Sequence, residues 1–104
     1  MELEFAGNEE SMVIKISGEL LADNCPLLRD KVLELCRKNC NQITLDMQDM
    51  QFIDSAGLGV LIGLKSTMIK RKGQLSIINL NQRIQEIFHL THIDKLFGVG
   101  ENSA

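Results

Sequence analysis

Residues 52–59 read Phe-Ile-Asp-Ser-Ala-Gly-Leu-Gly and lead into the longest helical pattern of the chain. Gly57 and Gly59 fall in the first helical turns, where glycine lowers helix stability. Ser55 stands where a serine caps a helix by accepting a hydrogen bond from a backbone N–H. The stretch therefore exposes backbone at the start of a helix, and we expect the functional site there.

The residues on either side of this stretch predict a strand and a helix. A strand is expected over residues 42–47, because every second side chain is apolar: Ile43, Leu45 and Met47. A loop over residues 48–54 and a helix over residues 55–72 follow. Lys70, Arg71 and Lys72 precede Gly73, and this order complements the dipole and carbonyl groups at the end of a helix. We favour that interpretation of the basic cluster over a phosphate-binding patch.

The N-terminal part predicts two strands and a helix. Alternating residues indicate strands over 2–5 and 12–17, with a loop over 19–24 after the pattern breaks at Gly18. A helix follows that ends near Asn39. Pro26 suits the first turn of this helix, and Asp23 or Asn24 is the expected cap. The helix has one apolar face, formed by Leu28, Val32, Leu35 and Cys36.

The C-terminal part predicts one more strand and one more helix. The strand is expected over residues 75–80, and Asn81 then caps a helix with Ile84, Ile87 and Phe88 on one face. A last turn groups Ile93, Leu96 and Phe97. Residues 101–104 have no apolar periodicity, and we expect them to be frayed.

The order of elements is β-β-α-β-α-β-α. We therefore predict an α/β fold in a single domain over residues 1–104. Strands with one polar side indicate a small mixed β-sheet with its helices packed mainly on one face. The same alternation disfavours a doubly wound nucleotide-binding fold, whose strands are buried on both faces.

Composition and charge narrow the function. A net charge of −3 and a pI near 5.3 argue against nucleic-acid binding and favour a protein partner. The uncharged run over residues 55–64 is too short to cross a bilayer, and the acidic N-terminus differs from a signal peptide. We expect a cytoplasmic protein without direct membrane insertion. The cysteines are expected to be reduced and to pack as small apolar groups: Cys25, Cys36 and Cys40.

Three kinds of site chemistry fit the sequence poorly. Ser55 lacks the G-x-S-x-G context of a nucleophile, and the only histidines lie far along the chain. Gly57 and Gly59 resemble a phosphate cradle, but no Gly-Lys-Ser/Thr follows. His89, His92 and Asp94 lack a further strong metal ligand. We therefore predict a protein that is no enzyme and holds neither a metal nor a cofactor.

Two interpretations of Ser55 stay open on physical grounds. It is either a helix cap among small residues that allow close packing, or a site of regulated phosphorylation at an accessible helix start.

The stretch and its flanks resemble the STAS domains, in particular the bacterial anti-sigma factor antagonists. The resemblance extends over nearly the whole chain. It includes Ser-Gly-Glu-Leu at 17–20, Thr-Leu-Asp-Met at 44–47, the signature at 52–59 and Leu-Thr-His-Ile-Asp-Lys-Leu-Phe at 90–97. Family members often carry an aspartate directly after Gly-Glu-Leu. Here Leu21 has that place and Asp23 follows two positions later.

The resemblance implies a partner switch. The unmodified antagonist would bind an anti-sigma factor that is also a serine kinase, phosphorylation of Ser55 would release it, and a phosphoserine phosphatase would reverse the modification. The residues implied in partner binding are Leu21, Asp23, Asn24, Asp54, Ala56, Gly57 and Leu58. Other readings are a STAS interaction subunit of another signalling complex or of a membrane transporter, and a nucleotide-binding module.

Overall fold

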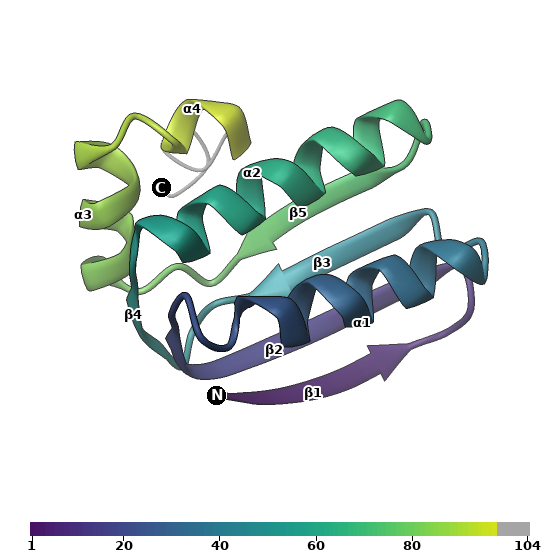
Figure 1. Ribbon diagram of the computed structural model, residues 1–104, viewed down its shortest axis with the longest axis horizontal. Coiled ribbons are helices and arrows are strands. Elements are labelled where there is room, and N and C mark those ends of the chain that lie inside the picture. The colour runs from purple at the N-terminus through teal and green to yellow at the C-terminus, as the bar shows by residue number, and fades with distance from the viewer. Residues whose placement is uncertain (98–104) are drawn as a thin grey trace.

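A computed structural model describes residues 1–97 of the protein (Figure 1). The tail over residues 101–104, predicted to be frayed, lies outside the described residues. The elements are β1 (Glu2–Gly7), β2 (Ser11–Leu20), α1 (Cys25–Arg37), β3 (Gln42–Asp46), β4 (Met50–Ile53), α2 (Ser55–Lys70), β5 (Gln74–Ile78), α3 (Gln82–Leu90) and α4 (Asp94–Phe97).

The strands form the mixed sheet that the sequence predicts. Its order is β1-β2-β3-β5, with β1 antiparallel to β2 and the other pairs parallel. Ile14 of β2 pairs with Leu45 of β3, which pairs with Ile77 of β5. All three side chains are buried on one face, so the alternation predicted for β3 sets which face carries the core.

Strand β4 was missed, because the prediction placed a loop over residues 48–54. β4 runs parallel to the end of β2, which continues past Gly18 to Leu20 instead of ending at residue 17. A register shift follows Gly18, whose φ is +95°. In β4 only the first and last residues, Met50 and Ile53, are buried, so the strand shows no alternation from which it could be recognised.

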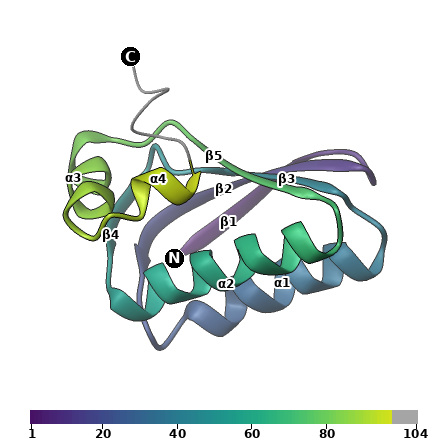
Figure 2. The same ribbon diagram turned by 90° about the horizontal axis from the view of Figure 1, so that it is seen from above.

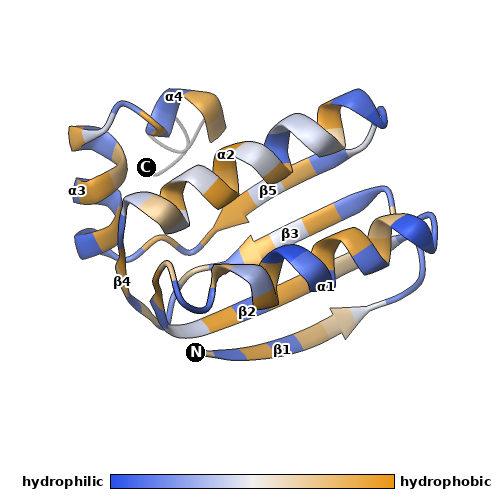
Figure 3. Ribbon diagram, viewed as in Figure 1, coloured by the Kyte–Doolittle hydropathy of each residue, from blue (hydrophilic) through white to orange (hydrophobic). Residues whose placement is uncertain are grey.

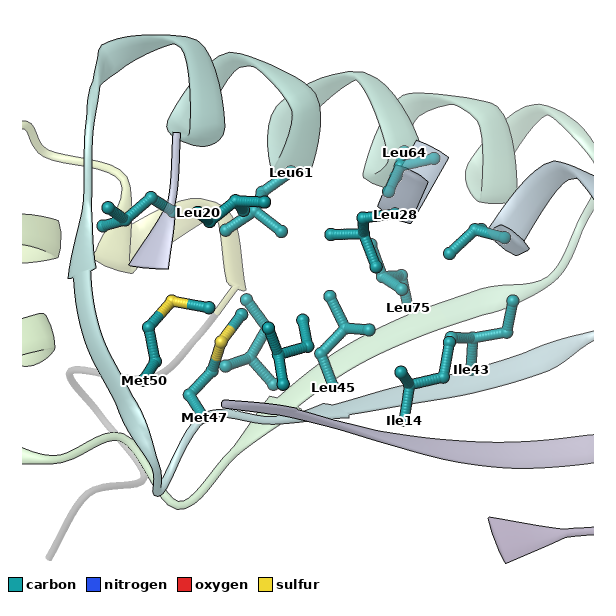
Figure 4. Packing of buried hydrophobic residues seen from close by; sticks show 14 of the residues in the cluster. Ile14, Leu20, Leu28, Ile43, Leu45, Met47, Met50, Leu61, Leu64 and Leu75 are labelled. Atoms are coloured by element: carbon teal, nitrogen blue, oxygen red, sulfur yellow. The ribbon is translucent and has the colours of Figure 1, made fainter. Parts of the chain in front are cut away.

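Helices α1 and α2 lie side by side on one face of the sheet, as predicted, and α3 and α4 lie at one end of it (Figure 2). Hydrophilic and hydrophobic residues alternate along α1 (Figure 3), and its buried face is Cys25, Leu28, Val32 and Cys36. Leu28, Leu61 and Leu64 from the helices meet Leu45 and Ile14 from the sheet (Figure 4). This core holds α1 and α2 against β2 and β3.

Several helix ends match the predictions and others differ by a few residues. Asn81 caps α3 by accepting a hydrogen bond from the Ile84 N–H at 3.0 Å. Helix α2 ends at Lys70, two residues early, because Lys72 already has a φ of 63°. In the last turn Ile93 is buried, but Leu96 is exposed, so the predicted apolar group loses one member.

The cysteines are free and buried, as predicted: Cys25, Cys36 and Cys40. Burial raises the pKa of the Cys36 thiol above its ordinary value. The Cys36 Sγ also contacts the Met68 Sδ at 3.4 Å between α1 and α2. These thiols pack as small apolar side chains.

Candidate functional site

Helix α2 is capped by Asp54, so of the two interpretations of Ser55 that the sequence left open, the helix cap is wrong. Asp54 has extended backbone angles, and its Oδ1 accepts a hydrogen bond from the Gly57 N–H at 2.9 Å. Its Oδ2 accepts a second from the Ala22 N–H at 3.1 Å, 32 residues away in the chain. One carboxylate therefore holds both the first turn of the helix and the loop after β2.

Ser55 is the first residue of α2, and its side chain is exposed. Its hydroxyl forms no side-chain hydrogen bond with any residue from 1 to 97. Ala56 beside it is also exposed. Because Asp54 does the capping, the Ser55 hydroxyl is open to a reaction that would leave the helix start intact.

The loop over residues 21–24, which contains three of the residues implied in partner binding, lies beside the start of α2. Asn24 folds this loop: its Oδ1 accepts from the Leu21 N–H at 2.8 Å, and its Nδ2 donates to the Glu19 carbonyl at 2.8 Å. Asn24 precedes α1, as predicted, but its side chain makes no cap hydrogen bond to that helix. Asp23, at the tip of the loop, is exposed.

Gly57 and Leu58 lie beneath this surface. A Cβ on Gly57 would be 2.7 Å from the Leu20 carbonyl oxygen and 2.7 Å from the Ile53 Cγ1, so only glycine fits there without movement. Leu58 is 7% exposed and belongs to the core. Of the residues implied in partner binding, Asp23 and Ala56 are exposed, and Leu21, Asn24 and Asp54 are half-buried.

A groove between α1 and α2 continues from Ala56, and the sequence interpretation missed it. It encloses about 400 Å³ and is lined by Arg29, Leu33, Ala56, Gly59, Val60, Gly63, Leu64 and Thr67. Ala56, Gly59 and Gly63 follow one another at three or four positions along α2, so these small residues lie on one face of the helix. This spacing could have indicated the groove from the sequence.

The histidines show no arrangement for catalysis at Ser55. His89 Nδ1 lies 3.3 Å from Asp94 Oδ2, within the C-terminal helices. Residues 1–97 contain no group of three His, Cys, Asp or Glu side chains placed to hold a metal ion. Burial, and then the charge of Asp54, raise the pKa of the Cys25 thiol next to the loop, which keeps this thiol protonated and unreactive at neutral pH.

No helix within residues 1–97 has both the length and the apolar character needed to cross a membrane.

Comparison with known families places this geometry in context. The model of the STAS domain matches residues 2–104. The chain belongs to the STAS family. The exposed serine at the start of α2 is thus part of a STAS domain, as the resemblance in sequence indicated.

Curated relatives and solved structures agree with this assignment. The anti-sigma-B factor antagonist of Bacillus subtilis (strain 168) is 28% identical over 96 residues, which cover 92% of this chain and 87% of the relative. An anti-sigma factor antagonist from Mycobacterium paratuberculosis has a TM-score of 0.80 at 20% identity and covers 92% of this chain and 81% of its own.

The anti-sigma factor antagonist SpoIIAA has been solved in two forms that share this fold. The unphosphorylated form has a TM-score of 0.71 at 20% identity and covers 85% of this chain and 82% of its own. The phosphorylated form, from Bacillus, has a TM-score of 0.71 at 20% identity and covers 86% of this chain and 83% of its own.

Proposed function

We propose that this STAS domain is an anti-sigma factor antagonist of a partner-switching system in the cytoplasm. Unmodified, it binds an anti-sigma factor that is also a serine kinase. Phosphorylation of Ser55 releases it, and a phosphoserine phosphatase restores binding. The observation that carries the proposal is that the Ser55 side chain is exposed and is not needed to cap α2, because Asp54 caps this helix. Two similarities support the proposal: the Bacillus subtilis relative is an anti-sigma-B factor antagonist, and SpoIIAA, which has a similar fold, has been solved in a phosphorylated form.

The proposed switch acts at the surface of the domain. A phosphoserine adds about −1.5 to −2 charges at neutral pH. The dipole of α2 would favour this charge by roughly 0.3–1 kcal/mol, whereas the Asp54 carboxylate next to it would oppose it. Asp54 already occupies the Gly57 and Ala22 N–H groups, so the phosphate would find these donors taken. The modification would therefore alter docking through charge and bulk and leave the fold unchanged.

The proposed docking surface is the exposed rim around Ser55. Asp23 and Ala56 contact the partner directly, with the exposed atoms of Leu21, Asn24 and Asp54 between them. The buried Gly57 and Leu58 support this rim from below. Because the rim carries carboxylates and no nucleic-acid patch is expected, the fitting partner is a protein.

Phosphorylation and binding test the proposal together. The protein is incubated with a candidate anti-sigma factor kinase and Mg-ATP, and intact mass and peptide analysis locate the phosphate. One phosphate on Ser55 is expected, and none on the Ser55→Ala variant. Ser66→Ala is the matched control, because Ser66 is another exposed serine of α2.

Binding of the kinase is then compared between variants. Ser55→Ala should retain the kinase and Ser55→Asp should lose it. Equal recovery by both variants, or a phosphate elsewhere in the chain, would contradict the switch. A STAS subunit of a different complex or of a transporter would bind its partner without any modification of Ser55. Nucleotide turnover abolished by Ser55→Ala would instead support a nucleotide-binding module.

A further inference from the structure

Two glycines of α2 are not explained by packing within the domain. A Cβ on Gly59 or on Gly63 would meet no atom within 4 Å. Glycine inside a helix lowers its stability relative to alanine, and both positions are exposed. Gly57 and Gly73 differ, because a Cβ there would come within 2.7 Å and 2.6 Å of a backbone oxygen. The fold therefore requires Gly57 and Gly73 but not the other two.

Both unexplained glycines line the groove between α1 and α2. They are four residues apart and so lie one above the other on the same helix face. Without side chains they leave the backbone of α2 bare, which lets a second backbone approach more closely than any larger residue allows. A helix of another protein that lies along α2 would fit this groove, because its side chains, one turn apart, could enter the space beside the two glycines.

The groove has an apolar floor and a single cation among its lining residues. Arg29 lies on the α1 side, and its nearest carboxylate is that of Asp30, the next residue, at 3.5 Å. Its side chain is 53% exposed, so this adjacent pair holds the guanidinium weakly. An acidic side chain on the incoming helix would complement Arg29 and set its register.

We propose that this groove receives a helix of the anti-sigma factor, with small or apolar residues facing Gly59 and Gly63 and a carboxylate facing Arg29. This inference rests on the proposed function and names the element of the partner that docks. The groove is continuous with the rim of the switch, because Ala56 lines it directly after Ser55. A phosphate on Ser55 therefore lies next to one end of the groove, where its negative charge opposes a carboxylate on the incoming helix.

The test uses substitutions that strengthen the free domain and weaken binding. Gly59→Ala and Gly63→Ala place a methyl group in open space and improve helix propensity, so the melting temperature should rise by roughly 4 °C for each. Affinity for the kinase, measured by calorimetry on the unphosphorylated full chain, should fall about tenfold for each and further for the double variant. A destabilised fold cannot mimic this result, because stability and affinity move in opposite directions.

Two controls isolate the groove. Ser66→Ala also improves helix propensity on an exposed part of α2 outside the groove, and it should bind like wild type. Arg29→Glu should weaken binding at least tenfold, while Arg29→Lys keeps the charge and retains most of the affinity.

The outcomes separate this inference from the switch. If both glycine variants and Arg29→Glu bind like wild type while Ser55→Asp does not, the groove inference is overturned and the switch stands. If Ser55→Asp also binds like wild type, the proposed function fails as well. If the free protein is a dimer in analytical ultracentrifugation and Gly59→Leu makes it a monomer, the groove holds a second copy and the inference is wrong.

Discussion

Replacing Asp54 by alanine should destabilise the domain through two separate contacts. The first is the cap on the Gly57 N–H, whose loss typically costs about 1 kcal/mol. The second is the hydrogen bond to the Ala22 N–H. Since Ala22 is exposed and water can replace the carboxylate as the partner of its N–H, we assign about 1 kcal/mol to this bond, below the roughly 1.5–3 kcal/mol typical of a charged acceptor. The total of about 2 kcal/mol should lower the melting temperature by roughly 8 °C.

Asp54→Ser divides the two contributions. A serine at this position keeps the cap but is too short to reach the loop, so about half of the loss should remain. Thermal unfolding by circular dichroism measures the totals. Amide hydrogen exchange supplies the local readout: protection at Ala22 should fall in both variants, and protection at Gly57 only in Asp54→Ala.

Asp23→Ala is the matched control, because Asp23 is an exposed carboxylate of the same loop and accepts no hydrogen bond from residues 1–97. It should melt within about 2 °C of wild type. Equal melting temperatures for Asp54→Ala and Asp54→Ser would refute the reasoning, since the cap would then contribute nothing.

Three further predictions follow from the packing and the titration of single groups. Gly57→Ala should lower the unfolding free energy by about 1–3 kcal/mol through overpacking against the Leu20 carbonyl, and a melting temperature at or above wild type would contradict the clash. Asn81→Ser should keep the cap of α3 but lose the Nδ2 donor to the Met50 carbonyl at 2.6 Å, at a cost of about 1 kcal/mol in denaturant unfolding; an unchanged midpoint would show that this bond contributes nothing. Burial raises the pKa of the Cys36 thiol above its ordinary value of 9.0, so the unfolded chain releases this proton first. The contribution of Cys36 to stability should be constant below pH 9 and be lost as the pH rises through the folded pKa, and Cys36→Ala should flatten that alkaline fall in urea titrations; an equal slope in both proteins would argue against it.

The order of strands and helices was predictable because most elements show their periodicity directly. The one missed strand, β4, is short, and it pairs with β2 at the irregularity beside Gly18, more than 30 residues away in the sequence. Such pairing is a tertiary property, and no pattern within residues 48–54 carries it. The mixed sheet could nevertheless be predicted, since β1, β2 and β3 each keep one polar side.

The start of a helix at Ser55 could be predicted from the sequence, but the residue that caps this helix could not. Asp54 and Ser55 are adjacent and both are good capping residues. The choice between them depends on the Ala22 N–H, which only the folded chain brings close. Gly57 and Gly59 look alike in sequence, yet a Cβ on Gly57 would collide with the Leu20 carbonyl, whereas a Cβ on Gly59 would point into open space.

Asp54 caps α2 and the adjacent Ser55 does not, and this difference affects how such a domain can evolve. One residue anchors the helix start and the next is free of structural demands. Under the proposed switch, a lineage could lose regulation by replacing the serine, which would leave a permanently active binder, and regain it by the reverse change. Neither step would pass through a poorly folded intermediate, because the residue that caps the helix is not the residue that changes.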